Sequence, residues 1–131
     1  MKKPADDACP CGSGLGYAQC CGAFHGGIPA PDAERLMRSR YTAYVRGLAD
    51  YLRATWHPDT CPADLGLGTA PRPQWLGLAV KSHAVQGAGH ATVEFVARYK
   101  LNGRASTLHE TSRFVRTDDG RWLYVDGDIR D

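Results

Sequence analysis

The chain has 131 residues, of which 43% are hydrophobic and 23% are charged, and its formal net charge is +2. These values are typical of one globular domain with a real core and leave room for a small additional module. No apolar run is long enough to cross a bilayer, so we expect no membrane span.

Four of the five cysteines, Cys9, Cys11, Cys20 and Cys21, lie close together near the N-terminus. Four thiolates at this spacing can surround one tetrahedral Zn²⁺ ion. The stretch Gly12-Ser13-Gly14 supplies the tight turn that a C-x-C hook needs after its second ligand. Because this segment has few apolar residues, it needs a metal or a disulfide to hold a shape. We therefore predict that these four cysteines bind one Zn²⁺.

Two alternatives compete with zinc, namely disulfides and incidental or redox-active thiols. Residues 1–7 contain no apolar segment of a secretory signal, and the side chains of the adjacent Cys20 and Cys21 diverge, so both features disfavour disulfides. So compact a cluster disfavours incidental thiols. We predict that Cys61 is an ordinary structural or free cysteine, and that His25 supports the ligands or is exposed.

Reduced zinc thiolates and the missing signal predict a cytoplasmic protein. Four thiolates and one Zn²⁺ together contribute −2, which brings the formal charge of +2 close to zero. A nearly neutral protein lacks the concentrated basic surface that nucleic-acid binding needs, so a nucleic-acid partner is not expected.

The helices are expected directly after the cysteine segment. Residues 1–28 form the predicted zinc module, residues 29–31 a linker, and residues 32–131 the main domain. Asp32 stands where an N-cap belongs, ahead of a helix to Arg46 that ends at Gly47. A second, shorter helix is predicted from about Leu48 to Trp56.

The second half of the chain alternates apolar and polar residues, which predicts β-strands. Turn signals separate four strands, at about 75–86, 90–101, 104–117 and 121–130. Asn102-Gly103 and Asp119-Gly120 are typical of two-residue hairpin turns. Only the two helices are available to cover the apolar face of such a sheet. We predict an α+β fold in which N-terminal helices pack on one face of a curved four-stranded antiparallel sheet.

The two hairpin turns fix the expected register. Phe95 then lies opposite Glu110, Phe114 opposite Val125, and Glu110 opposite Ile129. The predicted apolar face carries Leu76, Leu78, Val80, Val93, Phe95, Ala97, Tyr99, Leu108, Phe114, Leu123, Val125 and Ile129. The opposite face carries Lys81, His83, Thr92, Glu94, Arg98, Lys100, Thr107, Thr111, Arg113 and Asp126, with His83 facing Glu94 and Arg113 facing Asp126.

Polar residues interrupt the predicted apolar face and suggest a pocket. Ser82, Glu110 and Ser112 fall among its aliphatic residues, while Arg40 lies within the apolar arc of the first helix. A buried carboxylate and a buried guanidinium predict an ion pair between Arg40 and Glu110, direct or through one water. Such a pair is either structural or part of a ligand site. The candidate pocket residues are Arg40, Tyr41, Tyr44, Ser82, Glu110 and Ser112.

Several segments together resemble a known family. Cys9-Pro10-Cys11-Gly12-Ser13-Gly14, Tyr17 and Cys20-Cys21-Gly22 resemble the SEC-C zinc motif of the SecA translocase tail. In three later segments, 36–44, 51–58 and 121–127, the chain resembles the YchJ-like family of uncharacterised bacterial proteins. This resemblance implies a SEC-C motif followed by a domain similar to nuclear transport factor 2, which is a cone of helices and curved sheet.

Two functions follow from these expectations. The first is a zinc-binding adaptor or ligand-binding protein, whose zinc module contacts a protein partner and whose cone accepts a small ligand. The second is an enzyme of the isomerase, dehydratase or hydrolase type with Glu110 as general base. The fold alone cannot choose between them. We favour binding, because an enzyme of this type usually has an unpaired Asp or His inside the cone. The oligomeric state is left open.

Overall fold

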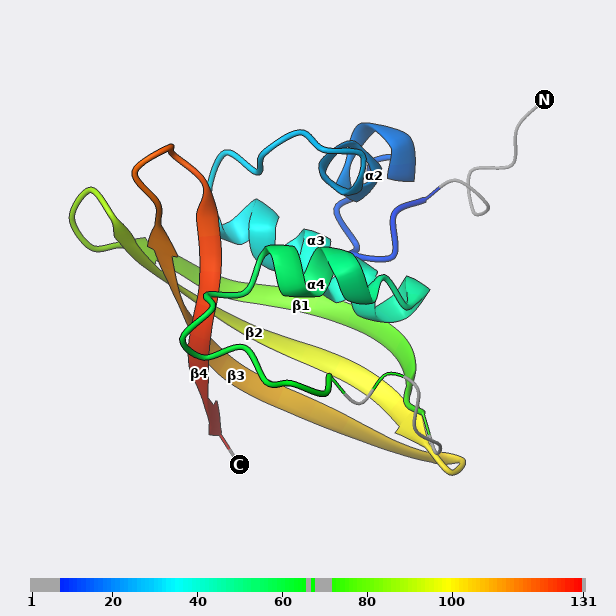
Figure 1. Cartoon of the computed structure of the whole chain (residues 1–131). Helices are drawn as coiled ribbons and strands as arrows, with labels where there is room; N and C mark the ends of the chain where they lie inside the picture. The colour runs from blue at the N-terminus through cyan, green and yellow to red at the C-terminus, as the bar shows by residue number, and fades with distance from the viewer. Residues whose placement is uncertain (1–7, 66, 68–71, 131) are drawn as a thin grey trace.

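A computed structural model describes residues 8–65, 67 and 72–130. The elements follow in the order η1 (Tyr17–Gln19), α2 (Cys21–His25), α3 (Ala33–Arg46), α4 (Ala49–Ala54), β1 (Gln74–Val85), β2 (His90–Leu101), β3 (Arg104–Arg116) and β4 (Trp122–Arg130). Figure 1 shows α3 lying across one face of the twisted sheet, with α4 beside it and the cysteine segment on the far side of α3. The predicted α+β architecture is confirmed. Among the described residues, no helix is long and apolar enough to span a membrane.

The main helix forms as its sequence signals predicted. The Asp32 side chain accepts a hydrogen bond of 2.8 Å from the backbone N–H of Arg35, which caps the first turn of α3. The helix ends at Gly47, whose φ of 72° lies in the left-handed region that glycine tolerates. In α4 the regular helix is shorter than predicted, with Leu48 at its N-cap and Thr55 at its C-cap.

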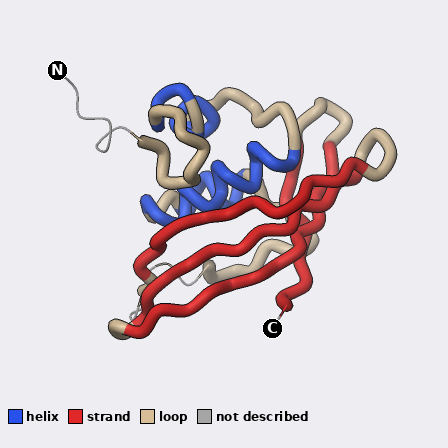
Figure 2. Tube along the Cα trace, turned by 180° about the vertical axis from the view of Figure 1, so that it is seen from behind, coloured by secondary structure: helices blue, strands red, loops and turns tan. Residues whose placement is uncertain are grey.

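The sheet has the strand order β1-β2-β3-β4, and every pair is antiparallel. Figure 2 shows it from behind, with the strands side by side and the helices beyond them. The Asn102-Gly103 hairpin has positive φ at both residues, 54° and 77°, as its turn type requires. The pairing of Phe95 with Glu110 is as predicted. Glu110 therefore faces the helices.

The second predicted hairpin differs from expectation. The Thr117 N–H donates to the Arg121 carbonyl over 2.7 Å, so the loop holds residues 118–120 rather than two residues. Consequently Phe114 pairs with Tyr124, and the predicted pairing with Val125 is wrong. A β-bulge next to Arg113 then restores the predicted pairs Arg113–Asp126 and Glu110–Ile129. As a result Tyr124, not Val125, lies opposite Phe114 on the helix side.

Two further bulges in β1 change which side chains face inward. They lie between Trp75 and Gly77 and between Val80 and Ser82. Each bulge adds one residue to a strand and reverses the alternation beyond it. Trp75 therefore packs against the core, while Leu76 is 39% exposed.

The second of these bulges overturns two sequence predictions. Ser82 lies on the outer face, where its hydroxyl donates to Glu94 over 3.4 Å, so its placement in the interior is wrong. His83 pairs with Val93 and comes within 3.9 Å of Glu34 in α3, so it faces the helices and not Glu94. Glu94 instead binds the ring of His109 over 2.6 Å.

The core lies between α3 and the sheet and continues into the cysteine segment. Its buried residues include Leu36, Met37 and Tyr41 of α3, together with Val93 and Phe114 of the sheet. The four N-terminal cysteines belong to the same cluster. The cysteine segment is thus packed on the protein and is not an extended tail.

Candidate metal centre and ligand cavity

The four N-terminal cysteine sulfurs lie within 4.8 Å of one another, and all four residues are buried. The Sγ atoms of Cys11 and Cys20 are 3.7 Å apart, and those of Cys20 and Cys21 are 4.0 Å apart. A tetrahedron with metal–sulfur bonds of about 2.3 Å has edges of about 3.8 Å. None of the four forms a disulfide. The cluster can therefore hold one metal ion with four sulfur ligands.

Local backbone geometry brings the four sulfurs together. Gly12 and Gly14 have φ values of 79° and 88°, which confirms the predicted tight turn after Cys11. The Cys9 N–H donates to the Leu15 carbonyl over 2.9 Å and closes this loop. The Ser13 hydroxyl lies 3.2 Å from the Cys20 sulfur. The C-x-C loop is thus closed by its own backbone and joined to the second cysteine pair through Ser13.

Without a metal the thiols share their protons unevenly. A hydrogen bond from Cys21 lowers the pKa of Cys11 to about 4, against the opposing effect of burial. The pKa of Cys21 is raised by the same contact and by burial. Thiolates bind metal ions, and a bound cation replaces protons at such a cluster. The hydrogen bond thus favours a thiolate at Cys11, which is the form of cysteine that binds a metal ion.

Polar contacts join the cysteine segment to α3, and the Arg46 guanidinium also lies 4.2 Å from the centre of the Tyr17 ring. Arg38 Nη1 donates to the Cys11 carbonyl over 2.9 Å, and the Cys9 sulfur lies 3.7 Å from the Thr42 hydroxyl. His25 Nε2 lies 2.8 Å from the Ser39 carbonyl, and the Tyr17 hydroxyl lies 2.7 Å from His25 Nδ1. Sequence reasoning missed this face of α3. The small side chains of Ser39 and Thr42, on the side away from the predicted apolar arc, were the available signal.

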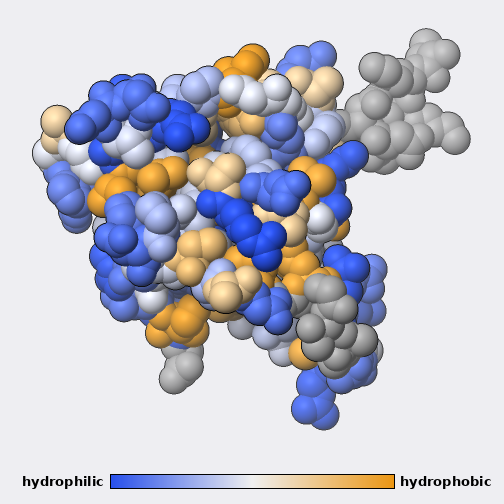
Figure 3. All heavy atoms as spheres, viewed as in Figure 1, coloured by the Kyte–Doolittle hydropathy of each residue, from blue (hydrophilic) through white to orange (hydrophobic). Residues whose placement is uncertain are grey.

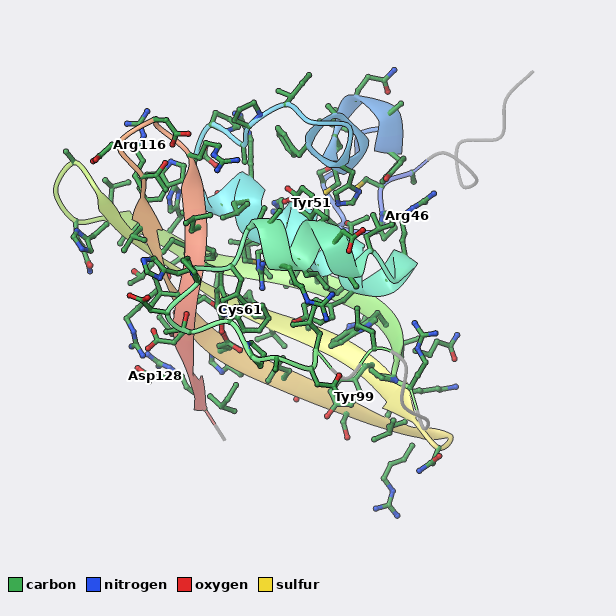
Figure 4. All side chains as sticks on the ribbon, in the orientation of Figure 1. Arg46, Tyr51, Cys61, Tyr99, Arg116 and Asp128 are labelled. Atoms are coloured by element: carbon green, nitrogen blue, oxygen red, sulfur yellow. The ribbon has the colours of Figure 1, made fainter. Side chains whose placement is uncertain are left out.

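Figure 4 shows the sulfur atoms grouped between the cysteine segment and α3. It also places Cys61 on the segment that follows α4, well away from that group. The Cys61 thiol donates to the Pro62 carbonyl over 3.6 Å. Cys61 is therefore not a ligand of the same centre.

A cavity of about 190 Å³ lies between α3, the sheet and Trp56, which follows α4. The walls are mostly aromatic, and Tyr44, Trp56 and Trp75 are only partly buried. The lining residues are Met37, Arg40, Tyr41, Tyr44, Trp56, Trp75, Phe95, Ala97, Leu108, Glu110, Ser112, Phe114 and Tyr124. All the predicted pocket residues except Ser82 lie on this wall.

Arg40 lies in the cavity wall and is only 5% exposed. Its Nη1 donates to the Leu52 carbonyl over 2.9 Å and to the Thr55 hydroxyl over 2.8 Å. The rings of Trp56 and Tyr124 lie 4.8 Å and 4.6 Å from the guanidinium carbon. Burial lowers the pKa of Arg40. One carbonyl oxygen, one hydroxyl oxygen and two aromatic faces thus stabilise this charge.

The predicted direct ion pair between Arg40 and Glu110 is wrong, because no carboxylate of the described residues lies within 4.0 Å of Arg40. Glu110 Oε2 instead accepts hydrogen bonds from the Ser112 hydroxyl over 2.6 Å and from the Tyr124 hydroxyl over 3.2 Å. Burial, followed by the charge of Glu110, raises the pKa of Tyr124. Tyr124, which the sequence analysis placed on neither face, contacts both charged groups.

Two family models match the chain. The SEC-C motif matches residues 7–23, and the YchJ middle domain, which is similar to nuclear transport factor 2, matches residues 32–127. The chain belongs to the YchJ-like family. This confirms the resemblance seen in the cysteine motif and the later segments.

The chain is similar over nearly its whole length to curated relatives. The UPF0225 protein of Ralstonia nicotianae is 61% identical over 132 residues, with 93% of this chain and 91% of that protein covered. The UPF0225 protein of Bordetella parapertussis is 55% identical, with 99% and 100% covered. These are relatives in a family without an assigned activity.

Two solved structures share the fold. The solution structure of a SEC-C motif containing protein from Rhodopseudomonas palustris is 35% identical, has a TM-score of 0.82, and covers 94% of this chain and 98% of its own. The crystal structure of a SEC-C motif containing protein from Psychrobacter arcticus is 31% identical, has a TM-score of 0.78, and covers 94% and 82%. Both support the arrangement of the cysteine segment with the cone-like domain.

Proposed function

We propose that this protein binds a small molecule in the cone and that one Zn²⁺, held by Cys9, Cys11, Cys20 and Cys21, stabilises the N-terminal module against α3. The observation that supports the first part most strongly is the cavity of about 190 Å³. An apolar cavity of about 150 Å³ admits benzene, so this one has room for a small ring with substituents. Its large aromatic side chains line the space but do not fill it.

The charged groups on the wall favour a ligand site over a purely structural core. Two hydrogen bonds and two aromatic faces stabilise the buried guanidinium, and a carboxylate on a ligand would stabilise it further. Glu110 and Ser112 place further polar atoms on the same wall. An apolar pocket with a few polar groups is the common form of a small-molecule site.

The proposed zinc has a structural role. A closed set of four cysteines leaves no open coordination position for a substrate, and all four are buried. The Cys9 sulfur lies beside Thr42, a residue of α3. The same helix carries Arg40. Free thiols and zinc thiolates require a reducing compartment, so we place the protein in the cytoplasm.

Ligand binding is tested by capture from a cell extract. The zinc-loaded protein is mixed with the small-molecule fraction of a bacterial extract and separated by gel filtration. Released compounds are then identified by mass spectrometry after denaturation. The matched control is Ala97→Leu, which fills the cavity at a residue that is 1% exposed. We expect a compound retained by the wild type and lost in the variant. Retention of nothing, or equal retention by both, would contradict the proposal.

The alternative enzymatic function uses the same cavity, with Glu110 as the general base. The observation that favours it is that Glu110 lies on the cavity wall, where the hydroxyls of Ser112 and Tyr124 both bind its Oε2 and leave Oε1 without a donor among the described residues. Incubation of the retained compound with the protein distinguishes the two, because an enzyme would convert it and a Glu110→Gln variant would bind without conversion.

Binding of a protein partner through the zinc module is a third candidate function. Leu15 and Ile28 are 55% and 60% exposed, and both line a groove between the module and α3. Figure 3 shows hydrophobic residues at the surface of the N-terminal module, and exposed apolar residues beside a groove are typical of protein contacts. A Leu15→Ser, Ile28→Ser double variant should lose cross-linking to a partner in cell lysate while it keeps its zinc. Unchanged cross-linking would exclude this surface.

A further inference from the structure

Arg40 has hydrogen-bond donors that the protein does not use. A guanidinium carries five N–H groups, and the bonds to Leu52 and Thr55 both come from Nη1. Within the described part of the chain, no hydrogen bond from Nε or Nη2 is found, although the residue lines the cavity. The geometry of a guanidinium favours a planar carboxylate as its partner.

Glu110 also has an unused atom. Ser112 and Tyr124 both donate to Oε2, and no described residue donates to Oε1. Oε1 is not one of the buried side-chain atoms that lack a partner, so this oxygen is accessible, and Glu110 lines the cavity. A hydroxyl or amine on a ligand would supply the missing hydrogen bond.

Tyr124 holds these two groups apart. Its ring lies 4.6 Å from the Arg40 guanidinium carbon, while its hydroxyl binds Glu110 over 3.2 Å. The positive group therefore lies at the face of the ring and the negative group at its hydroxyl end. A ligand that binds both Arg40 and Glu110 must carry an acceptor group and a donor group on different parts of one small molecule.

The remaining residues of the cavity wall indicate the molecular framework that carries these two groups. Phe95, Phe114 and Trp75 are aromatic, and Met37 and Leu108 are aliphatic. Such a wall fits a flat apolar ring, and about 190 Å³ allows one six-membered ring with small substituents.

We propose, on the basis of the ligand-binding function above, that the cavity binds a small planar carboxylate that also carries a hydroxyl or amino group. Its carboxylate contacts Arg40, and its donor contacts Glu110. The ring lies among the aromatic side chains of the wall.

A set of matched probes tests this ligand class by calorimetric titration of the zinc-loaded protein. The probes are 3- and 4-hydroxybenzoate, the two corresponding hydroxybenzamides, benzoate and phenol. At least one hydroxybenzoate should bind about tenfold more tightly than its amide, because the amide lacks the charge that Arg40 recognises. It should also bind more tightly than benzoate, which lacks the donor for Glu110.

Variants assign the two ends of the probe. Arg40→Gln should weaken hydroxybenzoate about tenfold or more and change hydroxybenzamide little, whereas Glu110→Gln should reduce the advantage of hydroxybenzoate over benzoate. The matched control is Arg113→Gln, because Arg113 lies on the outer face and pairs with Asp126 and Asp128. If Arg40→Gln does not fold, the comparison of acid with amide on the wild type still decides.

Three results would overturn the proposal: amides that bind as tightly as the acids, an acid preference that Arg40→Gln leaves intact, or no binding of any probe. An amide or phenol that binds the wild type but not Ala97→Leu would refute the ligand class and leave the cavity function standing. The cavity function itself fails only in the extract experiment.

Discussion

Arg40 shows how one buried charge can be accommodated without an ion pair. Its positive charge is shared between two acceptors at the end of α4 and the faces of Trp56 and Tyr124. Breaking a buried ion pair is usually costly because it leaves one buried charge uncompensated. Loss of the Glu110 charge would not do this to Arg40. The two charges on the cavity wall are stabilised separately.

This separation predicts a modest effect of Glu110→Gln on stability. The glutamine carbonyl can still accept from Ser112 and Tyr124, so the free energy of unfolding should fall by about 1–2 kcal/mol. Urea unfolding of the two proteins measures the difference. A loss of about 3–5 kcal/mol, the range for a broken buried ion pair, would show that Arg40 depends on Glu110 after all.

Gly127 positions Glu110 from the neighbouring strand. A Cβ at this glycine would overlap the Glu110 carboxylate, so only glycine allows the two strands to carry this side chain as they do. Gly127→Ala should displace the carboxylate and destabilise the protein by about 1–3 kcal/mol. The control is Gly89→Ala, where a Cβ meets nothing within 4 Å. Equal melting temperatures for the two variants would contradict this role.

The burial of His25 predicts that the stability of the protein depends on pH. Burial, with a smaller contribution from Arg46, lowers its pKa below the ordinary value of 6.5. The unfolded protein then binds the proton more tightly than the folded one, so stability falls as the pH drops below about 6.5. NMR titration of the His25 ring should give a pKa under 6.5, and His25→Gln should reduce the slope. A ring that titrates at or above 6.5 would refute this.

At the scale of elements, periodicity and turn signals were sufficient for the main helix, the four strands and the first hairpin. The pattern Asn102-Gly103 determined the pairing of β2 with β3, which places Glu110 on the helix side. The three bulges were not predictable, because the sequence alternates on both sides of a bulge and does not mark the added residue. This is why Ser82 and His83 exchanged faces and Tyr124 took the place expected for Val125.

The candidate site was predictable to a similar extent. The cysteine spacing alone predicted that the four thiols lie together, since they are close in sequence. Arg40 and Glu110 were correctly placed on the cavity wall by helical and strand periodicity. Their lack of a direct contact depends on Thr55, Trp56 and Tyr124, whose positions follow from the end of α4 and from the bulge in β4.

Gly22 allows η1 and α2 to pack closely, which gives a testable prediction. A Cβ on this residue of α2 would lie 2.7 Å from the Tyr17 carbonyl oxygen, and 2.8 Å from its ring, so η1 and α2 pack closely only around glycine. Gly22→Ala should destabilise the module by about 1–3 kcal/mol and weaken zinc binding. Gly26→Ala is the control, because its nearest atom would be 3.4 Å away. Equal zinc affinity for both variants would count against this packing.

At the scale of the whole molecule, the cysteine segment and the cone share one helix. One side of α3 meets the cysteines and His25, and the other lines the cavity. The predicted linker at residues 29–31 divides the zinc module from the cone, so the cone should fold without metal.

Zinc removal by a chelator should then disorder residues 8–28 and leave the strands intact in an NMR spectrum. Loss of the strand signals together with the module would contradict that division, and purified protein without zinc would refute the metal assignment.

We infer that the ligand site lies in the cone and that the proposed metal centre is structural. Chemical-shift mapping of the zinc-loaded protein, titrated with the compound captured from extract, distinguishes the two sites. We expect shifts at the Trp56 indole and at the methyl groups of Ala97 and Leu108, which line the cavity. Leu15 and Ile28, on the module groove, should not shift. Shifts confined to Leu15 and Ile28, with the cavity signals unchanged, would show that the ligand binds the module and not the cone.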